Sequence, residues 1–192
     1  MKTIWNRLVR IRTAYALLLV LAAVIFNQGA TLLLNDWYRR SQYPVPYYEG
    51  QLSFSAAKLT AYYRYMLDHN SLGIYFQTQC IDFVFILATF LLHGSIGLLV
   101  YKLVAHRPFL KKASLVALAA GLLAPCFDIL ENLVSFYFIA RPEAIPAALA
   151  LLYSSFSACK FGLFIVAYVL FGILLLWGVW MAICRRKRSA AL

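Results

Sequence analysis

Two carboxylates and an amide lie within five residues of one another in an otherwise apolar part of the chain. They are Asp128, Glu131 and Asn132, and the apolar stretch runs from Lys112 to Arg141. Spacings of three and four residues place the three side chains on one face of a helix. An ionisable group inside a bilayer costs about 2.5–3.5 kcal/mol on insertion scales, so a partner, water or a function is expected for it. A carboxylic acid held beside a carboxylate can act as a general acid near neutral pH, which is the chemistry this pattern predicts.

The composition of the chain is that of an integral membrane protein. Of its 192 residues 64% are hydrophobic and 13% charged, and the mean hydropathy is +0.76. A soluble domain of this length would have about 25% charged residues. The surplus apolar surface has no interior large enough to hold it, so lipid must cover it. No linker or internal repeat interrupts the sequence, and we expect a single domain over residues 1–192.

Four apolar segments are long enough to cross a hydrocarbon core of about 30 Å, which takes about 20 helical residues. We expect these spans at 13–34, 80–104, 113–139 and 147–184. The predicted fold is therefore an all-α membrane protein, a four-transmembrane-helix bundle. The fourth segment, from Pro146 to Cys184, would be about 58 Å long as one helix. It must either project beyond the outer surface or break near Ser154–Gly162.

The distribution of basic residues predicts how the chain crosses the membrane. Twelve of the 18 lysines and arginines lie before the first segment, in the connection from the second to the third (counting Lys102 at the end of the second), or after the fourth. By the positive-inside rule, both termini are expected to be cytoplasmic. The net charge of +11 could also suggest nucleic-acid binding. The basic residues are short flanks that suit lipid headgroups and no recognition module is present, so we expect no nucleic-acid partner.

Polar side chains on the other segments are expected at a similar depth. At 1.5 Å per residue, Asp128 lies about 24 Å, Asp82 about 30 Å and Lys160 about 37 Å from the cytoplasmic charges that flank their helices. We therefore predict one shared polar pocket toward the outer side, in which Lys160 is the counter-charge. The alternative is a buried network that only holds the helices in register. The candidate catalytic residues are Asp82, Asp128, Glu131, Asn132 and Lys160.

The long connection between the first two segments, residues 35–79, is rich in aromatic side chains. A short amphipathic helix is predicted at Ser55–His69, with Ser53 or Ser55 as its cap. Connections of this length are often lids or binding elements. The alternative is that the aromatic side chains only anchor the protein at the lipid headgroups. The candidate substrate-binding residues in and below this loop are Asn27, Gln28, Tyr62, Tyr65, Thr89 and Ser157.

The remaining reactive residues predict no further chemistry. His93 is expected near the middle of the bilayer, either as a proton relay or, as we favour, bonded to a neighbouring helix carbonyl. No HxxxH or CxxC motif occurs, and the four cysteines stand singly. Structural metal sites need three or four convergent ligands, so we expect no metal and no cofactor.

Three motifs resemble those of a known group of proteins. They are D-x-x-F from Asp82, D-x-x-E-N from Asp128 and F-[ST]-x-x-K ending at Lys160. Together they resemble a group of small four-helix membrane proteins without an assigned activity, over roughly residues 54–170. Many members have proline at the position of Ile86. The resemblance implies the site residues but no reaction. A looser likeness to sterol-isomerase-like and terpene-cyclase-like membrane proteins concerns architecture alone.

Three functions follow from these residues. The leading hypothesis is an enzyme that isomerises, cyclises or hydrolyses a lipid or another hydrophobic molecule, with Asp128 and Glu131 as acid and base and Asn132 as a positioning donor. The second is a protein that binds or transports a cation, an amine or a lipid headgroup. The third is a structural membrane subunit whose charges only specify packing.

Overall fold

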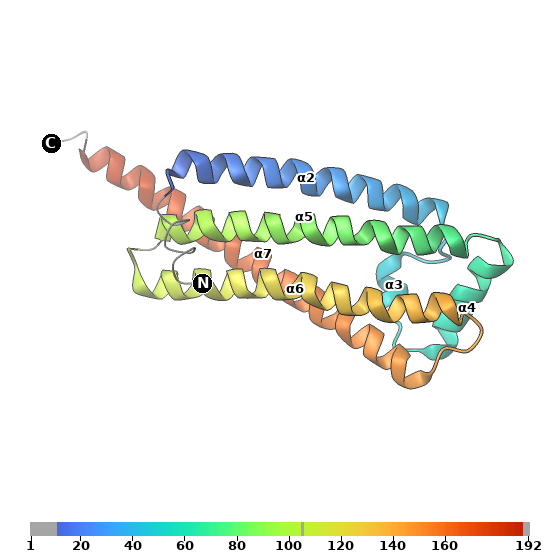
Figure 1. Ribbon diagram of the computed structural model, residues 1–192. Coiled ribbons are helices and arrows are strands. Elements are labelled where there is room, and N and C mark those ends of the chain that lie inside the picture. The colour runs from blue at the N-terminus through green and yellow to red at the C-terminus, as the bar shows by residue number, and fades with distance from the viewer. Residues whose placement is uncertain (1–10, 105, 190–192) are drawn as a thin grey trace. The chain divides into compact units, whose positions relative to one another are not determined.

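Helices account for all the regular secondary structure that the computed structural model describes, which covers residues 11–104 and 106–189 (Figure 1). Four of the helices are long and apolar enough to cross a membrane, which confirms the all-α, four-span fold and indicates a multi-pass membrane protein. The long helices are α2 (Thr13–Arg40), α5 (Leu72–Val104), α6 (Pro108–Ala140) and α7 (Ala147–Ser189); the short ones are α3 (Tyr47–Gln51) and α4 (Ala56–Asp68).

The long helices extend past the predicted spans. Helix α2 continues to Arg40 instead of ending at 34, and α5 begins at Leu72 instead of 80. The prediction followed hydrophobicity, whereas the added turns also carry polar side chains that are buried by neighbouring elements, such as Thr78 and Gln79. Helix α7 is continuous over 43 residues, about 65 Å, so the break considered near Ser154–Gly162 is not formed.

The described chain divides into two compact units, each built from parts of the four long helices. Unit 1 contains residues 11–25, 90–104, 106–122 and 163–189, and unit 2 contains residues 26–89 and 123–162. The expectation of a single domain stays a prediction. The core of unit 1 is apolar and partly made of small residues: Val100, Ala117, Ala120, Ala167, Phe171 and Leu174. Alanine at such positions lets helix backbones approach closely.

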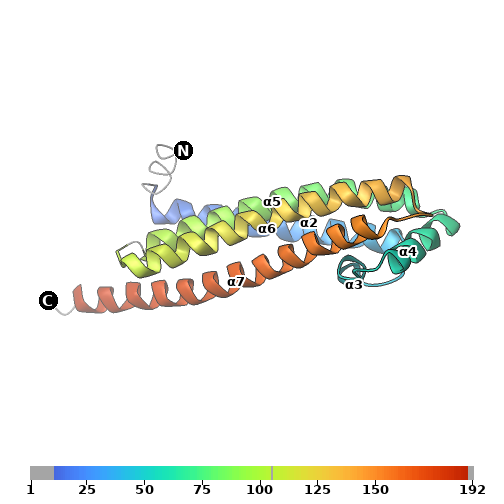
Figure 2. The same ribbon diagram turned by 90° about the horizontal axis from the view of Figure 1, so that it is seen from below.

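Unit 2 contains the short helices and the aromatic connection. Helix α4 starts at the predicted cap, since the Ser55 hydroxyl accepts the Lys58 N–H at 3.4 Å. Leu59, Tyr63 and Met66 recur at helical spacing and are fully buried, so α4 packs one face inward. They belong to a core cluster with Tyr75, Phe138, Ile145, Ala150 and Tyr153. The view in Figure 2 shows α3 and α4 beside the first turns of α7.

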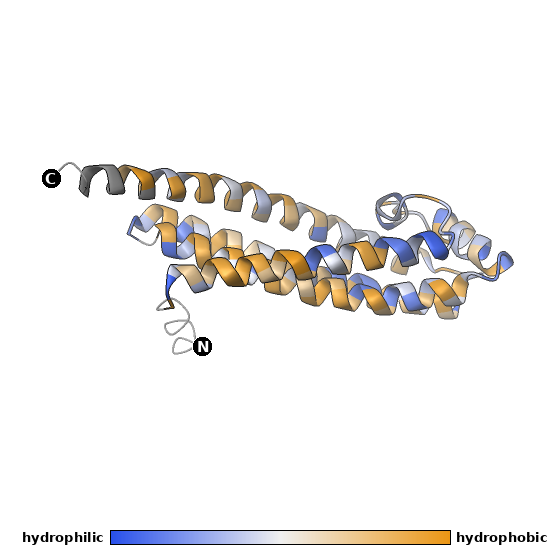
Figure 3. Ribbon diagram, turned by 90° about the horizontal axis from the view of Figure 1, so that it is seen from above, coloured by the Kyte–Doolittle hydropathy of each residue, from blue (hydrophilic) through white to orange (hydrophobic). Residues whose placement is uncertain are grey.

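A strained residue joins this connection to α7. Phe54 has φ 49°, in the left-handed region that bulky side chains seldom adopt, and its N–H donates to the Ser154 hydroxyl at 3.0 Å. The connection is shorter than expected and runs over residues 41–71. Figure 3 shows that the part of unit 2 that holds α3 and α4 is more hydrophilic than the long helices, whose ribbons are mainly hydrophobic.

Candidate functional site

A buried lysine on α7 bridges two carboxylates on α6. The ammonium of Lys160 lies 2.9 Å from Asp128 Oδ1 and 2.6 Å from Glu131 Oε2. Only 4%, 3% and 1% of Lys160, Asp128 and Glu131 are exposed. Lys160 therefore pairs with the carboxylates, as predicted. Because water is almost excluded, these contacts act in a low dielectric and are much stronger than surface ion pairs.

Two further hydrogen bonds extend this group. The Ser157 hydroxyl donates to Glu131 Oε2 at 2.8 Å, and the Asn132 amide nitrogen donates to Asp82 Oδ2 at 2.6 Å. Asp82 lies on α5, so the group connects three helices within unit 2. We call this group the carboxylate cluster. Its members are Asp82, Asp128, Glu131, Asn132, Ser157 and Lys160.

Helical spacing explains why these side chains meet. Asp128, Glu131 and Asn132 lie three and four residues apart on α6, and Ser157 and Lys160 lie three apart on α7. Each set therefore leaves one face of its helix. All five predicted catalytic residues are brought together, although Asp82 bonds to the amide and not to the ammonium.

The carboxylate cluster has more acidic than basic groups. It contains three carboxylates, and Lys160 is its one ammonium and the only lysine or arginine buried among the described residues. Each buried ion costs several kcal/mol unless a partner compensates it. The surplus negative charge must therefore be offset by bound protons or by another positive charge.

The two polar residues predicted on α2, Asn27 and Gln28, have different surroundings. The Asn27 amide donates to the Thr89 hydroxyl at 3.1 Å, and both side chains are buried, so α2 is joined to α5 within unit 2. Gln28 is exposed and is not brought to the carboxylate cluster, because one residue along a helix turns a side chain by about 100°. The prediction that placed Gln28 with Asn27 is wrong on this point.

Buried and half-buried tyrosines form a second layer in unit 2, which we call the tyrosine layer. Tyr63, Tyr75 and Tyr153 are buried, and Tyr38 and Tyr43 are half-buried against them. The Tyr75 ring lies 6.1, 5.2 and 5.5 Å from the rings of Tyr38, Tyr43 and Tyr63. Tyr63 also shares a hydrogen bond of 2.8 Å with Ser135 on α6. Burial, followed by the nearby Tyr75, raises the pKa of the Tyr43 and Tyr63 hydroxyls, which stay neutral donors at physiological pH.

The tyrosine layer lies close to the carboxylate cluster. The Ser157 hydroxyl, which donates to Glu131, also lies 3.0 Å from the Tyr153 carbonyl oxygen, and the Tyr38 hydroxyl accepts a hydrogen bond from Gln79, three residues before Asp82. A neutral phenol can donate a hydrogen bond to a carboxylate or to a ligand beside it. The layer therefore supplies donors near the acidic side of the site.

Of the two tyrosines predicted on α4 as substrate-binding residues, only Tyr62 is partly turned inward. Tyr62 is half-buried, with its ring 5.8 Å from that of Tyr43, whereas Tyr65 is exposed and stacks on His69 at 4.0 Å. Tyr63, which the sequence analysis did not choose, is the residue inside. Its spacing from Leu59 and Met66 marks the apolar face of the helix and could have identified it.

A buried glutamine was also missed. Gln79 is 1% exposed and lies three residues before Asp82 on the same face of α5. Its amide nitrogen donates to the Tyr38 hydroxyl at 3.3 Å, while its carbonyl oxygen accepts no hydrogen bond. The same is true of the Asn132 carbonyl oxygen. The position of Gln79, three residues before an intramembrane aspartate, could have identified it from the sequence.

His93 belongs to unit 1 and takes no part in the carboxylate cluster. Its ring lies 5.5, 5.1 and 6.1 Å from the rings of Phe164, Tyr168 and Phe171. It is completely buried; it interacts with the backbone of Gly121, but neither ring nitrogen makes a hydrogen bond of good geometry. The carbonyl bond expected for His93 is therefore not formed with normal geometry.

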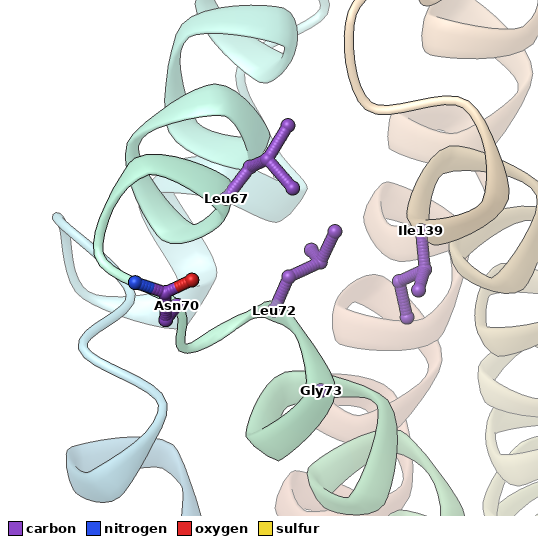
Figure 4. A pocket seen from close by; sticks show the side chains of 5 residues that line it. All are labelled: Leu67, Asn70, Leu72, Gly73 and Ile139. Atoms are coloured by element: carbon purple, nitrogen blue, oxygen red, sulfur yellow. The ribbon is translucent and has the colours of Figure 1, made fainter.

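The structure also has a pocket of about 380 Å³ in unit 2, shown in Figure 4. It lies at the turn from α4 to α5 and is mainly apolar. None of its lining residues belongs to the carboxylate cluster: Leu67, Asn70, Leu72, Gly73 and Ile139. The pocket is therefore separate from the acidic groups.

The remaining candidate ligands do not converge. Among residues 11–104 and 106–189, no three histidine, cysteine or acidic side chains lie close enough to hold a metal ion together. Cys80, Cys126 and Cys159 are exposed and are not joined by disulfides in the described part of the chain.

Comparisons of the chain with protein-family models, with curated proteins and with solved structures give no match. The geometry of unit 2 is therefore the basis on which a function can be argued.

Proposed function

We propose that this protein is a membrane enzyme that performs acid–base chemistry on a lipid or another hydrophobic molecule. One observation carries the proposal: two buried carboxylates, Asp128 and Glu131, share the single ammonium of Lys160. Two negative charges beside one positive charge in a dry site favour the state in which one carboxyl group keeps its proton. An acid and a base are then held side by side, which is the arrangement that proton-transfer catalysis requires.

The other members of the carboxylate cluster have supporting roles. Lys160 holds the charged carboxylate in place, and Ser157 fixes Glu131 by a hydrogen bond of 2.8 Å. Asn132 positions Asp82, the second carboxylate. Tyrosine hydroxyls near Glu131 would donate to a polar group of the substrate. Isomerisation, cyclisation and hydrolysis all need these elements.

The position of the cluster on membrane-spanning helices supports a hydrophobic substrate. The basic flanks of the helices support cytoplasmic termini, which would open unit 2 toward the outer leaflet. The partner is then a membrane lipid or a hydrophobic small molecule and not a nucleic acid.

Solvent isotopes test the proposal without knowledge of the substrate. The purified protein would be placed in nanodiscs with a total lipid extract, in D₂O or in H₂¹⁸O, and the lipids followed by mass spectrometry. Proton transfer to carbon during isomerisation or cyclisation adds deuterium that does not wash out, whereas hydrolysis adds ¹⁸O. We expect time-dependent labelling of one lipid class by the wild-type protein.

Amide variants identify the groups responsible. Asp128→Asn and Glu131→Gln should each abolish labelling while thermal unfolding in detergent changes little. Asp36→Asn is the matched control, because Asp36 is a half-buried carboxylate that pairs with Arg39 and Arg40 outside the cluster. Labelling at the wild-type rate in both amide variants, or no labelling by the folded wild-type protein, would overturn the proposal.

A further inference from the structure

The Asp82 side of the carboxylate cluster has an acidic group without a basic partner. Lys160 contacts Asp128 and Glu131, and no salt bridge joins Asp82 to a lysine, an arginine or a histidine among the described residues. Asp82 is 4% exposed, and its one hydrogen bond comes from the neutral amide of Asn132. The negative charge of Asp128 and the positive charge of Lys160 also act on it, in opposite directions, and Lys160 forms its direct contacts with the other two carboxylates. A positive charge near Asp82 would therefore be strongly stabilised.

Two buried amide oxygens, on the residue that contacts Asp82 and on a residue three positions before it on α5, have no hydrogen-bond donor. The Asn132 amide is held by Asp82 through its nitrogen, and its oxygen accepts nothing. The Gln79 amide is held by Tyr38 through its nitrogen, and its oxygen also accepts nothing. Both oxygens are buried, and a buried acceptor without a partner is costly. Both amides use their nitrogen atoms as donors, so their buried oxygens are left without a hydrogen-bond donor.

We infer that Asp82, Asn132 and Gln79 form a binding site for an alkali-metal cation. A carboxylate and two amide carbonyls are the hard oxygen donors that cations of this class prefer. A monovalent ion fits better than a divalent one, because no three acidic, histidine or cysteine side chains converge in the described residues. The inference departs from the sequence-based expectation that the chain has no metal site.

The charges of the unit 2 interior balance when this site is filled. The cation compensates Asp82, and Lys160 compensates one of Asp128 and Glu131. The remaining carboxyl group then holds the single proton that acid–base chemistry requires. Asp128, Glu131 and Lys160, which carry the proposed proton transfer, are not ligands of this cation site, so the two can be tested separately.

Cation-dependent unfolding tests the site. Wild-type protein would be dialysed into N-methylglucamine chloride and then titrated with NaCl or KCl at constant ionic strength and pH. A ligand that binds only the folded protein raises its stability with the logarithm of concentration above Kd. We expect a saturable rise in Tm with at least one of the two ions, and none with further N-methylglucamine.

Two variants locate the ion. Asp82→Asn should remove the cation-dependent rise and, in N-methylglucamine, unfold at the same Tm as wild type or higher, because it removes an uncompensated charge. Gln79→Leu keeps the charge and should weaken the apparent affinity about tenfold. Asp36→Asn should retain the full response.

The outcomes separate this inference from the proposed enzyme activity. Glu131→Gln, which should lose isotope labelling, should keep its response to the cation. A rise in Tm that persists in Asp82→Asn would overturn the site. So would a Tm that responds to pH but to neither ion, since Asp82 would then hold a proton in place of the cation.

Discussion

The interiors of the two units are built from the same four long helices but have different chemistry. In unit 1 the buried side chains are apolar apart from His93 and Ser114, among the described residues. In unit 2 the buried set includes three carboxylates, a lysine and several amides and hydroxyls. Alanine, valine and phenylalanine are thus sufficient to pack these helices against one another. The carboxylate cluster is therefore a feature of unit 2 alone, and its ionisable groups are the reason for proposing a function there.

The largest change in the free energy of unfolding is expected for a substitution of Lys160, in unit 2. Lys160→Met leaves Asp128 and Glu131 buried without an ammonium and should lower the free energy of unfolding by about 3–5 kcal/mol. Unfolding by sodium dodecyl sulfate in mixed micelles would measure it. The control is Lys58→Met, an exposed lysine on α4. If the cluster is the cause, adding Asp128→Asn and Glu131→Gln to Lys160→Met should restore most of the loss.

The close packing of unit 1 can be tested at two glycines. A Cβ at Gly121 would lie 3.0 Å from the His93 Cβ, whereas a Cβ at Gly94 would have nothing within 4 Å. Gly121→Ala should therefore destabilise the protein by about 1–2 kcal/mol through overpacking. Gly94→Ala should stabilise it by about 1 kcal/mol through helix propensity. Equal effects at the two positions would show that unit 1 is packed more loosely than described.

These variants test a fold and a site that the sequence predicted to different degrees. Hydrophobic length predicted the four helices, and the cost of intramembrane charges identified Asp128, Glu131 and Lys160, while the orientation expected from the basic residues stays a prediction. Helix ends were underestimated, because the turns around Gln79 gain stability from tertiary contacts that composition does not reveal. The bond between Asp82 and Asn132 was also hidden, since spacing gives the face of a helix but not the partner across from it.

His93 offers a smaller test of the same comparison. A buried imidazole without a well-formed hydrogen bond contributes little to folding, so His93→Leu should raise the free energy of unfolding by about 1 kcal/mol. The corresponding change in unit 2, Asn132→Leu, should lower it, because Asp82 then loses its donor. The same unfolding assay measures both. A large loss of stability in His93→Leu would indicate that His93 has a partner comparable to those of the carboxylate cluster.

The smallest effect is expected at the tyrosine layer. Tyr63→Phe removes the hydrogen bond to Ser135 and should cost about 1 kcal/mol. Combined with Ser135→Ala in a double-mutant cycle, the coupling should be about 0.5–1 kcal/mol. Tyr65→Phe, on the exposed side of α4, should change nothing measurable. A coupling energy near zero would show that the hydrogen bond between Tyr63 and Ser135 does not stabilise the contact of α4 with the polar interior of unit 2.

The contacts that α7 makes with Glu131 have a mechanical consequence. Ser157 and Lys160, one turn apart, both bind Glu131 Oε2, at 2.8 and 2.6 Å. A shift of α7 by one residue would move them by about 1.5 Å along the axis and turn them by about 100°, so both contacts would break. Glu131 thus sets the sliding and rotational position of this part of α7. A neutral Glu131 would accept both contacts less strongly than a carboxylate, so one proton would weaken two links between α6 and α7.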